Sequence, residues 1–153
     1  MNTFREILIT GGAGYVGSRL VPQLLEKNYK ITVYDSLFFG SDFLPKNDPN
    51  LRIIKGDIRD IELFKSHLKG IDVVLHLACI SNDASFELDE NLSKSINFDA
   101  FEGLVKHAKK EGVKRFVYCS SSSVYGVSKE REVKEDHPLV PLTLYNKFKG
   151  MCE

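Results

Sequence analysis

The stretch ILITGGAGYVGS at residues 7–18 constrains the fold of this chain more than any other feature. An apolar run ends at Thr10, and four glycines follow before a helical pattern begins. Strand, glycine turn and helix in this order are typical of a site for the pyrophosphate of a dinucleotide. The glycines let the backbone approach the phosphates, and the helix N-terminus supplies N–H groups and a partial positive charge. The predicted phosphate-binding residues are Gly11, Gly14, Tyr15, Val16 and Gly17.

Short apolar runs alternate with helical patterns along the whole chain. Apolar runs without polar alternation are typical of parallel strands that are covered on both faces. Strand–helix alternation with right-handed crossovers predicts an α/β protein with a doubly wound, Rossmann-type parallel sheet. The 153 residues suffice for one domain, so 1–153 is predicted to be a single dinucleotide-binding domain. Strands are expected near 6–10, 30–35, 51–55, 71–77 and 114–120, and helices near 14–27, 59–69, 90–110 and from about 142.

Composition argues against several partners. The 21 basic and 21 acidic residues balance, which gives no electrostatic reason to expect nucleic acid or an anionic membrane surface. No apolar run approaches the length of a membrane span, and the N-terminus lacks a signal-peptide pattern.

Three cysteines without metal-type spacing indicate reduced thiols in a cytoplasmic protein. Cys79 and Cys119 lie near predicted strand ends and are expected to be small buried hydrophobes.

Two aspartates at predicted strand ends indicate the type of dinucleotide. Asp35 follows Gly17 by 18 residues, where a carboxylate can accept from both adenosine ribose hydroxyls and would repel a 2′-phosphate. NAD is therefore favoured over NADP, although Asp35 can also simply end a strand. Asp57 can accept from the adenine amino group with Ile58 beside the ring. The alternative for Asp57 is the N-cap of the helix at 59–69.

Several motifs occur together in sequence order. They are TGGAGYVG, Asp35, GDIRD, HLAC at 76–79, Asn97, CSSSSVYG at 119–126 and YNKFK at 145–149. The set resembles the extended short-chain dehydrogenase/reductases, specifically the NAD-dependent epimerase/dehydratase family, which acts on nucleotide sugars. The resemblance implies NAD as cofactor and a nucleotide sugar as substrate. It also places Leu77 and Ala78 beside the cofactor through their backbone groups and gives Asn97 a structural role.

The YNKFK motif suggests a catalytic pair. Tyr145 and Lys149 are four residues apart, so on a helix they share one face. An ammonium near a phenol lowers the phenol's pKa and makes it a better base near neutral pH. The resemblance makes Tyr145 the base that removes a proton from a sugar hydroxyl, while Lys149 also holds the nicotinamide ribose. Taken alone, the same spacing also fits a solvated helix face.

The serine-rich segment supplies a third catalytic residue. In the family pattern the active hydroxyl lies four residues before the tyrosine of VYG, which makes it Ser121 here. Sugar 4,6-dehydratases of the family resemble ST-Asp-Glu-VYG, whereas this chain has Ser122 and Ser123 at the acidic positions. The resemblance therefore implies epimerisation through a transient keto sugar, or simple oxidation, rather than dehydration.

The chain ends at Glu153, while extended family members continue with further strands and a C-terminal substrate-binding domain. We therefore expect a truncated Rossmann domain that lacks those strands, with strand 114–120 at a sheet edge. Two functions stay open. The chain is either the cofactor half of a nucleotide-sugar epimerase or dehydrogenase, or a non-catalytic NAD-binding module or partner subunit.

Association is a separate prediction. Family members usually dimerise through the helices that correspond here to 90–110 and to the Tyr145 helix. Phe98 and Phe101 lie away from the expected core face of the helix at 90–110, so we expect a homodimer with these rings in the interface. The alternative is that both rings are covered within one chain.

Overall fold

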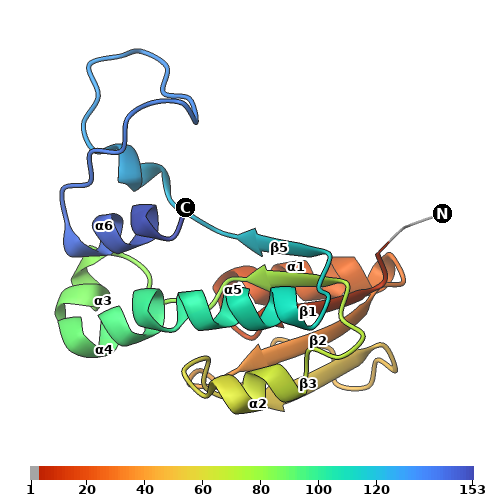
Figure 1. The fold of residues 1–153 in the computed structure, drawn as a ribbon. Helices are drawn as coiled ribbons and strands as arrows, with labels where there is room; N and C mark the ends of the chain where they lie inside the picture. The colour runs from red at the N-terminus through yellow and green to blue at the C-terminus, as the bar shows by residue number, and fades with distance from the viewer. Residues whose placement is uncertain (1–3) are drawn as a thin grey trace. The chain divides into compact units, whose positions relative to one another are not determined.

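The computed structural model describes residues 4–153, which form two compact units. One unit, called the sheet unit here, comprises the chain up to Ala78 together with Glu102–Cys119. The other, called the helical unit, comprises Cys79–Phe101 and Ser120–Glu153. Figure 1 shows the course of the chain through both, and each is described by itself below.

The sheet unit contains a five-stranded parallel sheet in the order β3-β2-β1-β4-β5. This order confirms the predicted doubly wound topology, with β5 at one edge as expected. Ile9 of the central strand lies opposite Val33 on one side and Leu75 on the other. The strands are β1 (Glu6–Thr10), β2 (Lys30–Asp35), β3 (Leu51–Lys55), β4 (Val73–His76) and β5 (Arg115–Tyr118).

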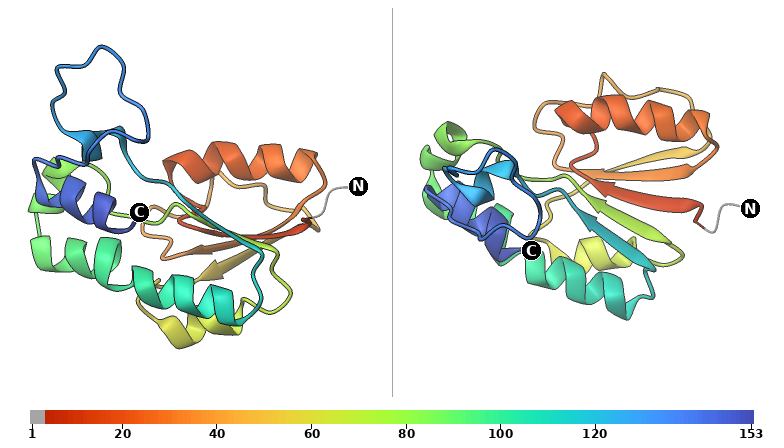
Figure 2. Two further views of the ribbon diagram at one scale, coloured as in Figure 1. Left: turned by 45° about the horizontal axis from the view of Figure 1, so that its top comes forward. Right: turned by 90° about the horizontal axis from the view of Figure 1, so that it is seen from above.

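Helices cover both faces of this sheet (Figure 2). Helix α1 (Tyr15–Glu26) lies on one face, while α2 (Ile61–Ser66) and α5 (Phe101–Lys110) lie on the other. Val21 and Leu25 of α1 are buried against strand residues such as Ile9, because apolar side chains recur on one face of the helix. The helix continues through Pro22 and ends at Glu26. These layers place the carboxyl ends of β1 and β2 beside the glycine turn.

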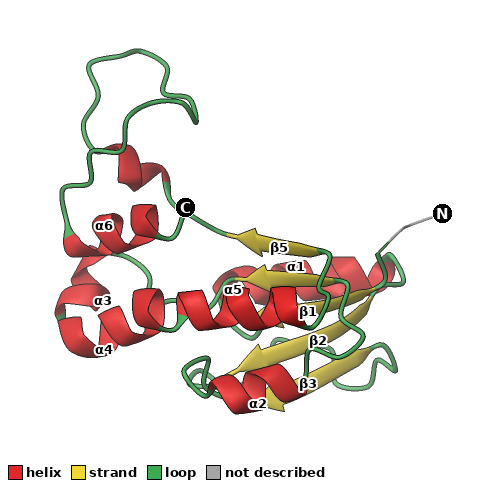
Figure 3. Cartoon of the chain, in the orientation of Figure 1, coloured by secondary structure: helices red, strands yellow, loops and turns green. Residues whose placement is uncertain are grey.

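The helical unit consists of short helices and a long loop. Its regular elements are α3 (Asp83–Glu87), α4 (Glu90–Lys94), a π-helical segment η1 (Ser95–Asp99), the 3-10 helix η2 (Ser122–Tyr125) and α6 (Leu144–Met151). Figure 3 shows the irregular segment that joins η2 to α6. The predicted helix at 90–110 is present but is interrupted by η1, and α3 was not predicted.

Candidate functional site

Two glycines, Gly11 in the turn after β1 and Gly17 in α1, are required by close backbone packing. Gly11 has a φ of 70°, and a Cβ added there would lie 2.6 Å from the Cα of Ala78. A Cβ at Gly17 would lie 2.1 Å from the carbonyl oxygen of Gly12. No larger residue fits either position without moving backbone, so these glycines determine how closely the strand, turn and helix pack.

Gly14 serves a different purpose. A Cβ there would meet a single heavy atom within 4 Å, the Gly11 carbonyl oxygen at 3.2 Å, so the protein leaves space beside it. Gly14 is also the N-cap of α1 and provides no side-chain hydrogen bond to the first turn. Tyr15 and Val16, at the start of the helix, are exposed. This helix start, uncapped and with space beside Gly14, fits a diphosphate, because helix N-termini bind anions through their N–H groups.

Asp35 ties the end of β2 to the glycine turn. Its Oδ2 accepts from the backbone N–H of Ala13 at 3.0 Å, and its Oδ1 accepts from the N–H of Leu37 at 2.8 Å. Each carboxylate oxygen can accept a second hydrogen bond. The carboxylate is thus held rigidly next to the turn and retains acceptor capacity for a ribose.

Asp57 is paired rather than capping a helix. Its carboxylate accepts from the Arg59 side chain, with Nε at 2.9 Å from Oδ1, and these hydrogen bonds hold the pKa of Asp57 below its ordinary value of 3.8. The N-cap of α2 is Asp60, which accepts from Leu63 N–H, so the capping alternative for Asp57 is wrong. Ile58 is buried, with 5 % of its surface exposed.

Leu77 and Ala78 follow the carboxyl end of β4. The Leu77 N–H donates to the Thr10 carbonyl oxygen at 3.0 Å, and Ala78 is the close neighbour of Gly11. The preceding His76 is buried and its Nδ1 lies 2.7 Å from the Thr10 hydroxyl. Among residues 4–153, no three His, Cys, Asp or Glu side chains form a group suited to a metal ion.

In the helical unit, the serine-rich segment is linked to α6. Ser121 is the N-cap of η2, and its Oγ lies 2.6 Å from the Oγ of Ser123. Ser123 in turn donates to the side-chain oxygen of Asn146, the residue after Tyr145. Asn146 is buried. The predicted Ser121 and Tyr145 are therefore connected through two residues for which the sequence analysis predicted no catalytic part.

Tyr145 lies in the first turn of α6 and packs edge-on against Phe86, with ring centroids 6.3 Å apart. Burial raises its pKa above the ordinary value of 10.0, and Cys79 and Asp83 raise it further, while a hydrogen bond from the backbone N–H of Asn82 lowers it. The pKa of Tyr145 is thus shifted upward, whereas the sequence analysis expected Lys149 to lower it. Lys149 itself is a buried residue one turn further along α6.

Asn97 has the structural role that was expected of it. Its side-chain nitrogen donates to the carbonyl oxygen of Ile80 at 2.8 Å, and its side-chain oxygen accepts from Ile80 N–H at 2.8 Å. Asn97 lies in η1 and is buried. These two bonds fix Ile80, which lies in the segment after β4, to η1.

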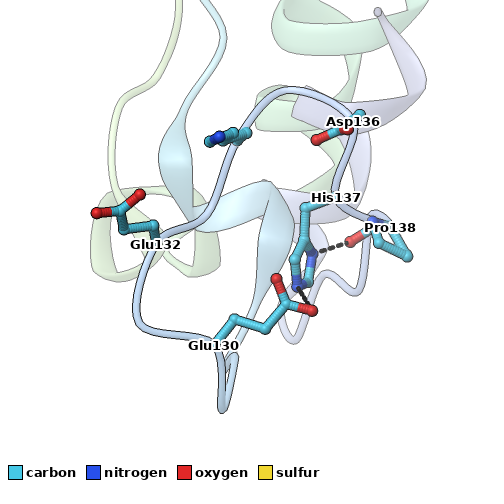
Figure 4. Close-up of a pocket in the computed structure, with 6 residues that line it drawn as sticks. Glu130, Glu132, Asp136, His137 and Pro138 are labelled. Atoms are coloured by element: carbon cyan, nitrogen blue, oxygen red, sulfur yellow. Dashed lines mark hydrogen bonds and ion pairs between the residues drawn. The ribbon is translucent and has the colours of Figure 1, made fainter.

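A hollow of about 400 Å³ in the helical unit is formed by the loop at 130–138 and contains none of the predicted site residues. Figure 4 shows His137 there, with its Nδ1 2.9 Å from the Pro138 carbonyl oxygen and its Nε2 4.0 Å from Glu130. A smaller hollow, about 140 Å³, is lined by Tyr145 together with Asp83, Phe86, Glu87, Glu90 and Leu142–Leu144.

Two further expectations need correction. Cys119 is exposed rather than buried, and Cys79 is half-buried, so neither behaves as a core hydrophobe. Phe98 is half-buried and packs on Phe148, with ring centroids 5.1 Å apart, so its ring is covered in part within one chain. Among residues 4–153 there is no helix that is long and apolar enough to cross a membrane.

Sequence reasoning missed three residues that shape these sites. Tyr34 is fully buried under the end of β3 and donates to the Asp57 carbonyl oxygen at 2.9 Å. Asn146 accepts a hydrogen bond from Ser123, and Asn82 is among the groups that shift the pKa of Tyr145. The positive φ of Asn82 has no local sequence signal.

Comparison with known proteins agrees with this architecture. Residues 7–153 match the NAD dependent epimerase/dehydratase family. A putative UDP-glucose 4-epimerase of Methanocaldococcus jannaschii is 33% identical over 151 residues, which cover 96% of this chain and 48% of that protein. The chain thus spans about half the length of the curated relatives that it matches.

Two solved structures are also similar. The UDP-N-acetylglucosamine 4-epimerase of Methanobrevibacter ruminantium, in complex with UDP-N-acetylmuramic acid, has a TM-score of 0.90 at 32% identity, covering 98% of this chain and 48% of that one. The dTDP-glucose 4,6-dehydratase DesIV of Streptomyces venezuelae, with NAD and TYD bound, has a TM-score of 0.87 at 33% identity. The match covers 95% of this chain and 48% of that one. The chain therefore belongs to the NAD-dependent epimerase/dehydratase family.

Proposed function

We propose that this chain forms the NAD-binding portion of a nucleotide-sugar epimerase or dehydrogenase. The observation that carries the proposal is the fixed carboxylate of Asp35, which accepts from Ala13 of the glycine turn and from Leu37. A carboxylate held there can accept from both hydroxyls of the adenosine ribose and repels a 2′-phosphate, so the site suits NAD. The residues assigned to NAD are Gly11, Gly14, Tyr15, Val16, Gly17, Asp35, Asp57, Ile58, Leu77, Ala78, Tyr145 and Lys149.

The residues assigned to the chemistry are Ser121, Tyr145 and Lys149. NAD bound here would supply the hydride acceptor for the sugar carbon that becomes the carbonyl. Tyr145 removes the proton from the hydroxyl on that carbon, and Ser121 hydrogen-bonds the reacting oxygen. Lys149 holds the nicotinamide ribose. Ser122 and Ser123 provide no carboxyl group for eliminating water, so epimerisation or oxidation is proposed rather than dehydration.

The direct test is incubation of the chain with NAD and a panel of UDP- and dTDP-sugars. We expect NADH absorbance or an epimerised sugar by NMR, lost in Tyr145→Phe and kept in the matched control Tyr29→Phe. A Tyr145→Phe variant as active as the wild type would refute the catalytic assignment.

One observation favours the second candidate, a non-catalytic NAD-binding module. The pKa of Tyr145 is raised by burial and by Cys79, which makes the phenol a poorer base near neutral pH. A wild-type chain that binds NAD but produces neither NADH nor an epimer from any sugar of the panel would support this candidate.

We also propose that two copies pair through the helical stretch 90–110 and the Tyr145 helix. Phe98 is covered in part by Phe148, and Leu92 is an exposed apolar residue of the same stretch. Light scattering at high concentration should give the mass of a dimer, and a monomer mass would refute the pairing.

A further inference from the structure

Tyr34 is a fully buried residue at the last position but one of β2, directly before Asp35. A buried tyrosine hydroxyl usually has a hydrogen-bond partner. Here the hydroxyl donates to the carbonyl oxygen of Asp57, 23 residues further along the chain, at 2.9 Å. The side chain therefore joins the strand that ends in one aspartate assigned to NAD to the other such aspartate.

The backbone at the end of β2 makes similar connections. The carbonyl oxygen of Tyr34 accepts from the N–H of Gly11 in the glycine turn at 2.9 Å. The carbonyl oxygen of Asp35 accepts from the N–H of Gly56, the residue before Asp57, at 2.9 Å. The end of β2 is thus bonded to the turn after β1 on one side and to the segment after β3 on the other.

The tyrosine ring is held tightly between its neighbours. A Cβ added at Gly56 would lie 2.4 Å from the Cζ of Tyr34, so the backbone there packs directly on the ring. Phe64 of α2 packs on it edge-on, with ring centroids 5.7 Å apart. Burial raises the pKa of Tyr34 to about 12, and Asp60 and Asp57 add to this rise. The hydroxyl therefore keeps its proton near neutral pH and remains a donor to Asp57.

The carboxylate of Asp57 retains room for a ligand. Within the described part of the chain, it accepts from three N–H groups of Arg59, namely the backbone N–H, Nε–H and Nη2–H. A carboxylate offers about four acceptor sites. About one site is therefore left, which is enough for a donor such as the adenine amino group.

We propose that Tyr34 is a positioning residue for the adenine side of the NAD site, whose hydroxyl holds Asp57 where the carboxylate can accept from the adenine amino group. The proposal rests on the NAD binding proposed above and on the assignment of Asp57 to NAD. Tyr34 is fully buried and contacts no ligand itself, so it acts through Asp57.

The test is calorimetric titration of the chain with NAD and with nicotinamide hypoxanthine dinucleotide, which has a carbonyl oxygen where adenine has its amino group. The ratio of the two affinities is the readout, because a change in the folded fraction affects both ligands equally. Tyr34→Phe removes only the hydroxyl, and the Asp57 carbonyl oxygen keeps the N–H of Asp60 at 3.0 Å, so the variant should fold. Tyr29→Phe removes a hydroxyl just before the other end of β2 and is the matched control.

We expect the wild type and Tyr29→Phe to bind NAD about tenfold or more tightly than the hypoxanthine dinucleotide. Tyr34→Phe should lower this preference by about fivefold, as loss of one hydrogen bond implies. Asp57→Ala should remove the preference, and combining it with Tyr34→Phe should change the ratio no further.

An unchanged preference in Tyr34→Phe would overturn the proposal, because the hydroxyl would then serve the fold alone. A further loss when Tyr34→Phe is combined with Asp57→Ala would also overturn it, because Tyr34 would then act through another residue. A wild type that binds both dinucleotides equally would contradict the role of Asp57 and with it the proposal. A folded wild type that binds neither would overturn the proposed function as well, so the two failures remain distinguishable.

Discussion

Ser123 donates a hydrogen bond to the side-chain oxygen of Asn146 over 2.5 Å and so links the serine-rich segment to the helix of Tyr145. A hydroxyl has one proton to donate, so in the 2.6 Å pair of serine hydroxyls Ser121 is the donor to Ser123. Ser121 Oγ also accepts from the backbone N–H of Ser123 at 3.2 Å. One lone pair of Ser121 therefore remains for a further hydrogen bond.

The Ser123–Asn146 bond should be measurable as a coupling free energy. We expect a double-mutant cycle of Ser123→Ala and Asn146→Ala in urea denaturation to give about 1 kcal/mol, the usual net value of a buried hydrogen bond. Ser122→Ala, at an exposed serine next in sequence, is the control and should not couple to Asn146→Ala. Additive effects of the first pair would show that the bond contributes nothing.

Asp35 should determine the choice between NAD and NADP. Replacing it by Asn keeps an oxygen acceptor but removes the charge that repels a 2′-phosphate, so the preference for NAD should fall by about tenfold or more. Calorimetric titration of both dinucleotides measures this preference. Asp42→Asn, at an exposed aspartate paired with Lys46, should keep it. Equal preference in Asp35→Asn and the wild type would contradict the assignment.

Gly17→Ala should lower the free energy of unfolding more than the same change at Gly103, a helix glycine whose close neighbour is a flexible side chain. Gly17→Ala places a Cβ 2.1 Å from the carbonyl oxygen of Gly12, and we expect a loss of about 3 kcal/mol in the free energy of unfolding because backbone cannot yield cheaply. At Gly103 the contact at 3.0 Å is with the flexible end of Ile61, so Gly103→Ala should change stability by about 1 kcal/mol or less. Equal losses in urea denaturation would contradict this account of the turn.

Asp72 should make the free energy of unfolding depend on pH in the acid range. Hydrogen bonds from Lys114 and from the N–H groups of Arg5 and Glu6 lower its pKa from 3.8 to about 2. Because the folded-state pKa is the lower one, the stabilisation is present above about pH 4 and is lost as pH falls toward 2.

Asp72→Asn should therefore cost about 1 kcal/mol at neutral pH, after allowance for solvent screening, and less as the solution is acidified. Urea midpoints measured from neutral to acid pH for wild type, Asp72→Asn and Asp42→Asn test this. A constant difference between Asp72→Asn and wild type at every pH would argue against the ion pair as its cause.

The sheet and its glycine turn could be predicted because their signals are local. Apolar runs mark β1 to β3 at the residues where the structure has them, and Asp35 lies at a strand end that the sequence itself shows. The ranges predicted for β4 and β5 were each three residues too long. At β4 the apolar neighbours Ile71 and Leu77 look the same as members of the strand.

What could not be predicted depends on contacts between distant segments. Helix α3 buries one residue, Phe86, in five, too few for a periodic signal. The π-helical segment coincides with the two bonds of Asn97 to Ile80, which lies 17 residues away in the chain. The spacing of Tyr145 and Lys149 correctly predicted that they lie on one helix. The groups that shift the pKa of Tyr145, however, come from the segment at 79–83.

NAD binding by calorimetry tests the central claim most directly, with Gly14→Val as the decisive variant. A side chain at Gly14 meets little protein but would occupy the space at the start of α1, so the variant should fold as the wild type does yet bind NAD at least about tenfold more weakly. Saturable binding by the wild type with this loss is the predicted result. A folded wild-type chain that takes up no NAD, or a Gly14→Val variant that binds it equally well, would contradict the account.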